Sequence, residues 1–390
     1  MRNIRLVIIL LLILTTSLNM SCWDSRDIEE LALVVAIGID LGEQPDTYNV
    51  TFQVARPDLI GQGQESGGGT NAVWVTTTTG NSLFEAINNA RKYFPRQIFF
   101  GYTQLLVFGE ELAQTGVGPL LDFAQREINL RRSIWIAVAK GEAKTIMETK
   151  PQLAQIPAIG LVSLFGLQQH FTLAYTMRFG DFVADIGTPY TGATAPLVEV
   201  VKSVPDETVP MEDETNDTAV FKGDRLTGWL NNRETIGLLW LQGKAEDASL
   251  QIRDPLDERY LVNIDIVRAR VNTKVEIIDD KIVYQVQGLT EGRFASQTAP
   301  HDLSSPERIK LVEKHMATAI ENKMRDTFKK AQELGVDFIG VGHLMSKDQP
   351  KKWKEIEQQW EDFFQEVVID VEAVAHLRRT GAITQPTKYK

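Results

Sequence analysis

Cys22 is the residue with the most distinctive chemistry, because it is the only cysteine among 390 residues. It follows a basic start with Arg2 and Arg5, a wholly apolar run at 6–14 and a mostly small, polar stretch at 15–21. This order is typical of a secretory signal, and the apolar run is too short to span a bilayer. We therefore expect residues 1–21 to be a signal peptide that ends at Cys22.

A bacterial lipoprotein signal has this form, with a cysteine directly after the cleavage site. The thiol takes a diacylglycerol, the amine is palmitoylated or left free, and acyl chains hold a soluble domain on a membrane at about 0.8 kcal/mol per buried methylene. The chain has no second cysteine for a disulfide. Such signals usually carry Leu at position −3, whereas this one has Asn19 with Leu18 before it. The alternative is a plain signal peptide with an incidental cysteine, and we expect lipid attachment at Cys22.

Other residue types that support catalysis do not form a recognisable pattern. The five histidines are far apart and none belongs to an HExxH motif: His170, His301, His315, His343 and His376. The stretch GQGQES at 61–66 lacks the third glycine of a dinucleotide-binding turn and precedes a strand-like pattern. No GxxxxGK[ST] or GxSxG motif occurs. The sequence predicts no catalytic residue, no cofactor and no metal site, and so indicates a role in binding or assembly.

Composition and charge narrow the class of partner. The formal net charge is −11, and removing Arg2 and Arg5 with the signal makes it −13. An acidic chain is a poor candidate for nucleic acid, which requires basic patches to neutralise phosphates. No apolar run of 18 residues follows Cys22, so no further spanning helix is expected. The 369 residues that remain (390 − 21) predict two or three domains.

Hydrophobic periodicity predicts alternating short elements before residue 202. The expected helices are 24–33, one from a capping box at Ser82 and Glu85 to near Pro95, 117–129 and 158–170. The expected strands are 34–41, a half-buried antiparallel partner at 48–54, 72–79, 98–108, 133–140 and 195–201, with a flexible loop at 61–71.

Residues 203–217 mark the clearest boundary, because they hold six carboxylates, two prolines and no basic side chain. We expect an N-terminal region at 22–202, which can be divided into two lobes near residue 150, an acidic linker at 203–217, and a C-terminal domain at 218–385.

Longer elements are predicted after the linker. They are a hairpin at 219–230 turning at 222–224, a helix at 232–242, a β region at 260–288 turning at 279–280, and a strand at 367–379. The longest helix begins at Ser305-Pro306, ends at Gly335, and buries Ile309, Val312, Met316, Ile320, Met324, Phe328 and Ala331. A second helix buries Trp353, Ile356, Trp360 and Phe363. The pattern predicts a multi-domain α+β protein of mostly antiparallel sheets flanked by helices.

The start of the mature chain resembles that of the Ger(x)C family, the C subunits of spore germinant receptors. The shared pattern is a cysteine, a Trp-Asp-x-Arg start and an A-x-G-x-D strand: Cys22, Trp23, Asp24, Arg26, Asp27, Ala36, Gly38 and Asp40. Gly38 within a strand suggests a bulge or a close backbone approach. Later stretches at 103–113, 219–244, 337–353, 370–374 and 377–383 also resemble the family, and they include Trp229, Trp240, Arg378, Arg379 and Gly381.

The resemblance implies a function that composition does not. It implies one of three subunits of a nutrient germinant receptor, lipid-anchored on the outer face of the spore inner membrane, built as three α+β lobes and without a known enzymatic activity. The implied partners are an A subunit with membrane spans and a B subunit resembling an amino-acid transporter. Two alternatives remain: a solute-binding lipoprotein that delivers a ligand to a transporter, which would need two similar lobes with parallel sheets, and a surface hydrolase.

Overall fold

The computed structural model describes residues 30–56, 72–127, 129–149, 156–171, 174–200 and 216–379, with the isolated positions 4 and 154. Several sequence predictions lie outside these residues. They concern the signal peptide and its cleavage site, the lipid attachment at Cys22, the motif residues Trp23, Asp24, Arg26 and Gly381, the loop at 61–71, and the linker except for its last two residues, 216 and 217.

The first sheet has ten strands, and its middle is parallel. The middle strands lie in the order β8 (Ala193–Val198), β6 (Trp135–Ala139), β5 (Leu105–Gly109) and β1 (Leu31–Leu41). Antiparallel strands extend both sides: β2 (Tyr48–Ala55) and β3 (Val73–Gly80) beyond β1, and β9 (Asn216–Lys222) and β10 (Arg225–Asn231) beyond β8. Strands β5 and β6 are buried throughout, as expected when helices cover both faces of a parallel sheet.

Two apolar layers lie on opposite faces of this sheet. One contains Ile37, Ile39, Leu106 and Phe108, and the other contains Val35 and Leu105 with residues from α5 and α6. The helices of this part are α2 (Leu83–Arg91), α3 (Glu110–Thr115), α4 (Gly118–Arg126), α5 (Ala143–Glu148), α6 (Pro157–Phe171) and α7 (Phe179–Gly187).

The half-buried strand predicted at 48–54 is instead covered on both faces. The polar side chains between its apolar residues are buried, because Gln53 donates from Nε2 to Met147 O (2.7 Å) and accepts from Ala158 N (3.1 Å). Helices α5 and α6 thus provide polar partners for the strand's second face. A period-two pattern cannot reveal a helical layer contributed by residues about a hundred positions later.

Two further predictions in this part are wrong. The helix expected at 24–33 is a strand at its described end, because Leu31–Leu33 pair in parallel with Gln97–Phe99. The single strand expected at 98–108 is divided into β4 (Gln97–Phe99) and β5 by a 3₁₀ turn (Phe100–Tyr102). Both differences come from pairing with β1. The beginning of β1 pairs with β4 and is therefore a strand, and its later part pairs with β5, so 97–109 is divided into two strands.

The capping box predicted at the start of α2 is half formed. Ser82 Oγ accepts the N–H of Glu85 (3.1 Å), as expected of an N-cap serine. The Glu85 carboxylate accepts the N–H of Asn81 (2.9 Å) instead of returning to Ser82. The remaining helices and strands expected in this part are confirmed, with their ends shifted by a few residues.

The second sheet has four strands in sequence order: β11 (Ser249–Arg253), β12 (Leu261–Ile278), β13 (Lys281–Gln297) and β14 (Val368–Arg379). The hairpin of β12 and β13 turns at the predicted Asp279-Asp280, where φ is 49° and 60°. Aspartate tolerates this left-handed conformation better than most residues do. Strand β14 runs parallel to β13, because a helical segment connects the two strands.

The longest helix, α9 (Pro306–Leu334), is confirmed. Ser305 Oγ accepts the N–H of Arg308, Pro306 occupies the first turn, and Gly335 ends the helix in the left-handed conformation (φ 63°). The predicted apolar stripe is buried from Val312 to Ala331, whereas Ile309 is half-buried.

The second C-terminal helix, predicted over 353–363, is divided in two. The pieces are α11 (Pro350–Ile356) and α12 (Trp360–Glu366), with a 3₁₀ turn (Glu357–Gln359) between them. A separate helix, α10 (Val341–Asp348), precedes them, and Pro350 lacks the N–H that would continue α10 into α11. Because the 3₁₀ turn rotates the apolar face, Phe364 is buried in place of Phe363, and Trp353 and Phe363 are half-buried.

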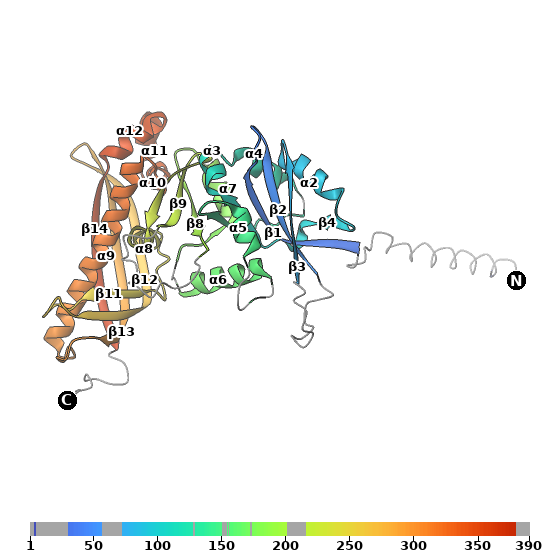
Figure 1. The fold of residues 1–390 in the computed structure, drawn as a ribbon. Coiled ribbons are helices and arrows are strands. Elements are labelled where there is room, and N and C mark those ends of the chain that lie inside the picture. Colours follow the sequence, from blue (N-terminus) through green and yellow to red (C-terminus); the bar gives the residue numbers. More distant parts are fainter. Residues whose placement is uncertain are drawn as a thin grey trace.

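Helix α8 (Asn232–Leu241) joins the two sheets, because it follows β10 of the first sheet and packs on α9 beside the second. Figure 1 shows three successive parts: the strands around β1, the middle strands β8 and β9 with α7, and the four-stranded sheet with α9. The predicted multi-domain α+β class is confirmed, with a parallel centre in the first sheet that the sequence did not reveal. None of the described helices is long and apolar enough to cross a membrane.

Candidate functional site

Asp40 caps a helix that lies far away in the sequence. Its Oδ1 accepts the N–H of Ala143 (2.7 Å) and its Oδ2 the N–H of Lys144 (3.0 Å), both in the first turn of α5. Burial raises the pKa of this carboxyl, against the effect of the two hydrogen bonds. Gly109 leaves the necessary space, because a Cβ there would lie 2.1 Å from Asp40 Oδ1. Asp40, the last residue of the A-x-G-x-D pattern, therefore fixes the start of α5 against β1.

Gly38 provides the close approach between β1 and the same helix. A Cβ at this position would lie 2.9 Å from Met147 Cγ and 3.3 Å from Ala143 Cβ. The irregularity in the pairing of β1 with β2 occurs earlier, between Val34 and Ala36. Of the two interpretations of Gly38, the structure contains the close approach.

The stretch at 219–244 forms the junction between the sheets. Asn231 and Glu234 form a reciprocal capping box at the start of α8, and Arg233 pairs with Asp326 of α9 (2.7 Å). Gly237 lies against α9, since a Cβ there would be 2.1 Å from Thr327 Oγ1 and 2.2 Å from Lys323 O.

The two tryptophans of this stretch differ in exposure. Trp240 is buried, and its Nε1 is without a hydrogen-bond partner among the residues that the structure describes. Trp229 is half-buried on β10 and packs at the edge of the main core. Trp240 belongs to the main core and Trp229 packs against it, so both contribute to the packing of the junction.

Asp337 organises the turn between α9 and α10. Its Oδ1 accepts the N–H groups of Gly340 (2.8 Å) and Val341 (3.0 Å), and its Oδ2 accepts that of Gly342 (2.7 Å). The indole Nε1 of Trp360 also donates to Oδ2 (3.1 Å). The side chain is fully buried, and burial raises the pKa of its carboxyl. The stretch at 337–353 is thus built around one buried acceptor.

The remaining predicted site residues lie at the end of the chain or apart from one another. Arg378 donates to Glu291 Oε1 on the exposed face of the second sheet (2.6 Å), and the backbone of Arg379 pairs with Arg293. His343 is exposed on α10, whereas His301 contacts Asp254 (3.0 Å). In the described ranges no three His, Cys, Asp or Glu residues form a group that could hold a metal ion. Among the described site residues, the structure therefore brings Gly38 and Asp40 together at α5 and places the tryptophans and arginines on other elements.

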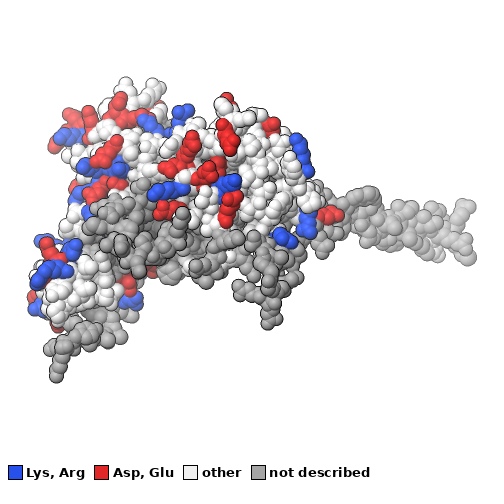
Figure 2. Space-filling model, in the orientation of Figure 1, with Lys and Arg blue, Asp and Glu red and all other residues white. Residues whose placement is uncertain are grey.

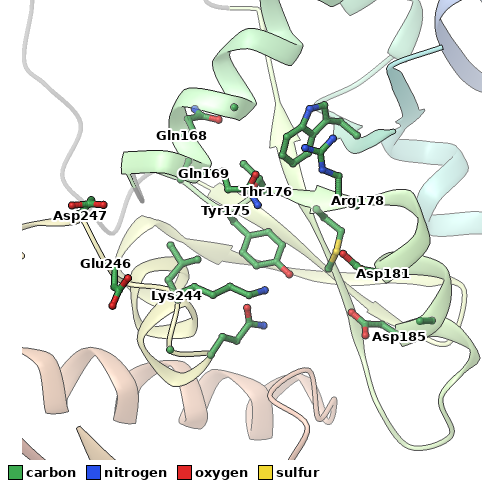
Figure 3. A pocket seen from close by; sticks show the side chains of 18 residues that line it. Gln168, Gln169, Tyr175, Thr176, Arg178, Asp181, Asp185, Lys244, Glu246 and Asp247 are labelled. Carbon is green, nitrogen blue, oxygen red and sulfur yellow. The ribbon is translucent and has the colours of Figure 1, made fainter. Parts of the chain in front are cut away.

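A cavity of about 820 Å³ lies where α6, α7 and the segment after α8 meet. Figure 3 shows Tyr175 and Lys244 extending toward the side on which α7 presents Asp181 and Asp185. The guanidinium of Arg178 lies over the ring of Trp135, 3.2 Å from its centroid, and donates to Ser133 O (2.6 Å).

The chemistry of this cavity is that of binding. Tyr175 Oη shares a hydrogen bond with Thr194 Oγ1 (2.6 Å), so the phenol is committed to the wall. Burial raises the pKa of Asp185 to about 6, while the charge of Lys244 opposes the shift. The described lining supplies cations, carboxylates and amides but no nucleophile paired with a base. Sequence reasoning missed this cavity, because its walls come from separate segments that share no motif.

We expect Asp185→Asn to stabilise the protein at alkaline pH. The folded-state pKa of about 6 lies above the ordinary 3.8. The protonated carboxyl of Asp185 therefore adds to the free energy of unfolding below pH 4, and this contribution is lost as the pH rises through about 6. After allowance for partial exposure, the raised pKa corresponds to a loss of about 2 kcal/mol in the free energy of unfolding between pH 4 and pH 8. Urea unfolding at pH 4 and pH 8 should show the variant equal to the parent at pH 4 and more stable by about that amount at pH 8.

The exposed Asp247→Asn at the same cavity provides the control, because Asp247 is not among the charges that shift the pKa of Asp185, and it should change the two measurements alike. An Asp185→Asn protein with an unaltered difference between pH 4 and pH 8 would contradict this account of the cavity.

Two family models cover the described folds in order. Residues 24–200 match the spore germination protein N-terminal domain, and residues 216–381 match the family described as "Spore germination B3/ GerAC like, C-terminal". The chain belongs to the Ger(x)C family of spore germination proteins. The landmark stretches of this Ger(x)C chain, as far as they are described, form buried caps, close helix contacts and strand pairs.

Individual relatives agree with this assignment. The chain is 25% identical to spore germination protein KC of Bacillus subtilis (strain 168), with 97% of each chain covered. It is 22% identical to spore germination protein B3 of the same organism, with 88% of this chain and 90% of that one covered. The crystal structure of the GerBC protein shares the fold, with a TM-score of 0.58 and 18% identity over 91% of this chain and all of that one.

Proposed function

We propose that this Ger(x)C protein is the C subunit of a nutrient germinant receptor and is needed for receptor assembly or signalling. The observation that carries the proposal is the match of the two Ger(x)C family models, in order, to residues 24–200 and 216–381. Its partners would be the A and B membrane subunits, and neither nucleic acid nor a cofactor would take part. The division at the acidic segment 203–217, between the two matched regions, is part of this proposal.

A non-enzymatic role accounts for the chemistry of the described residues. Of the buried aspartates, Asp40 and Asp337 accept backbone N–H groups and so act as caps, while Asp254 accepts the N–H of Leu256 and contacts His301 Nε2. The histidines of the described segments are spread over separate elements. A binding or assembly protein needs broad contacts and rigid packing rather than an activated nucleophile.

The proposed location is the outer face of the spore inner membrane, with Cys22 acylated. A carrier of solutes is less consistent with the fold, because a ten-stranded sheet and a four-stranded sheet do not form two similar lobes. Titration of the purified protein with amino acids, sugars and nucleosides separates the two functions: tight stoichiometric binding of one nutrient would favour the carrier.

The receptor function is tested by deleting the gene and measuring spore germination. Spores without the protein should form normally, fail to respond to the nutrients of this receptor, and still germinate with exogenous dipicolinate, which bypasses receptors. The A and B partners should be lost from or inactive in the spore membrane. Normal nutrient responses in the deletion strain, with every other receptor removed, would refute the proposal.

Acylation is tested by Cys22→Ala, with Ser25→Ala as the matched control next to the anchor. The alanine variant should incorporate no acyl label, leave the membrane fraction or stay uncleaved, and lower nutrient germination to the level of the deletion strain, because no thiol remains to carry the diacylglycerol. Ser25→Ala should behave as the parent. Full membrane retention and full germination of Cys22→Ala would show that the thiol is incidental.

A further inference from the structure

A basic and aromatic surface occurs at one end of this acidic protein. The segment from Arg91 to Tyr102 contains three basic residues and no acidic one, although the chain as a whole carries a net charge of −11. Figure 2 shows Lys and Arg side chains at the end of the molecule that carries α2 and β4. We define the basic–aromatic edge by its exposed residues: Arg91, Lys92, Tyr93, Arg96 and Tyr102.

The side chains of this edge are available for contact. Tyr93 is 72% exposed and Tyr102 is 51% exposed. Arg91 and Lys92 donate only to the neutral side chains of Asn88 (2.8 Å) and Asn89 (2.9 Å) on the same helix. Within the described segments, none of the three basic residues forms an ion pair with a carboxylate, whereas most other parts of the surface mix both signs.

The edge is held rigidly from below. Phe94, Ile98 and Phe100 alternate with the outward residues and are buried in the main core. Phe94 contacts the ring of Trp74 at 4.7 Å and that of Phe52 at 6.0 Å between centroids. The exposed tyrosines therefore project from a fixed support, so little conformational entropy would be lost on binding.

The strand pairing places this edge beside the entry of the chain. Leu31 pairs with Gln97, the residue after Arg96, and the first residues of β1 and β4 run in parallel. Seven residues lie between Cys22 and Glu30, so eight Cα-to-Cα steps separate the two (30 − 22). Whatever their conformation, these steps span at most about 30 Å, so an acyl group at Cys22 would keep Glu30, beside the start of β4, within that distance of the bilayer.

We propose that the basic–aromatic edge lies on the headgroups of an anionic lipid bilayer and holds the four-stranded sheet away from the membrane. The proposal rests on the acylation of Cys22 proposed above. Tyrosine suits the membrane interface because its ring is apolar and its hydroxyl polar, and each nearby Lys or Arg is attracted to anionic lipid. Glu85 precedes the edge on α2, and Glu30 adjoins Leu31, which pairs with Gln97, so two carboxylates oppose the three basic residues.

The chain allows a site-specific depth measurement, because an acylated Cys22 would leave no free thiol. Gln97→Cys, exposed between edge residues, would carry an environment-sensitive fluorophore on the mature acylated protein. Lys354→Cys on α11 is the control position at the other end of the molecule. In vesicles of phosphatidylcholine and phosphatidylglycerol with spin-labelled lipid, the probe at 97 should be quenched several-fold more than the probe at 354.

Charge reversal tests the contacts themselves. Arg91→Glu, Lys92→Glu and Arg96→Glu together should shift the equilibrium between docked and free edge by at least about 100-fold and remove the quenching, because each lost basic residue contributes about fivefold near an anionic surface and each new carboxylate is repelled by it. The matched triple variant, Lys347→Glu, Lys351→Glu and Lys354→Glu, alters exposed lysines of the opposite end and should keep the quenching at 97. In the parent protein, the quenching of the probe at 97 should be weaker with vesicles of neutral phosphatidylcholine alone.

The outcomes separate this inference from the anchor. Vesicle-bound protein whose probe at 97 is quenched no more than that at 354 would overturn lipid docking while leaving acylation intact. Protein that does not stay with the vesicles would overturn both. Quenching or protection at 97 that appears only in spore membranes containing the other subunits would assign the edge to a protein partner and contradict the lipid proposal.

Discussion

Asp337→Ala should lower the free energy of unfolding by about 4 kcal/mol or more. The substitution removes the acceptor of the N–H groups of Gly340, Val341 and Gly342 and of the indole N–H of Trp360. A buried donor left without a partner costs about 1–3 kcal/mol, and the turn can relax only in part because it lies under Trp360. Denaturant unfolding followed by tryptophan fluorescence measures the loss.

Asp337→Asn is the matched control, because it keeps the volume and one of the two oxygens. One oxygen still accepts two of the four donors, whereas the new amide N–H₂ meets the other two. The loss should therefore be about half that of Asp337→Ala. Burial raises the pKa of Asp337, so the neutral amide also avoids the cost of an ionised group at neutral pH. Equal losses for both variants would show that volume, not hydrogen bonding, holds this turn.

Gly237→Ala should destabilise the junction of the two sheets by about 3 kcal/mol. The new Cβ would lie 2.1 Å from Thr327 Oγ1 and 2.2 Å from Lys323 O, both on α9, so the two helices must separate. Separation would also strain the hydrogen bond from Thr327 Oγ1 to Glu234 O (2.7 Å). Overpacking of this kind costs about 1–3 kcal/mol or more, against a gain of about 1 kcal/mol in helix propensity.

Gly166→Ala in α6 isolates the propensity effect, because no atom lies within 4 Å of the position that its Cβ would take. This variant should be neutral or more stable by up to about 1 kcal/mol. If the protein is the proposed receptor subunit, Gly237→Ala should also lower the amount of this chain in spore membranes, and Gly166→Ala should not. Similar stability for the two variants would mean that α8 can move away from α9 without cost.

Local rules determined much of this fold. Ser305, Pro306 and Gly335 set the ends of α9, and Asp279-Asp280 sets the turn of the long hairpin. In each case the signal and the structure lie within a few residues of one another, so nearest-neighbour chemistry decides the conformation. The Ger(x)C membership also followed from the sequence, because its stretches occur in order along the chain.

Tertiary structure alone decided what those stretches do. Asp40 finds its partner at Ala143, 103 positions later, Gly237 faces Thr327 of α9, and the cavity takes its walls from α6, α7 and the segment after α8. The basic–aromatic edge depends on the pairing of Leu31 with Gln97. A pattern in one segment cannot specify such partners, since the burial and desolvation that make each contact favourable arise only when both segments are packed.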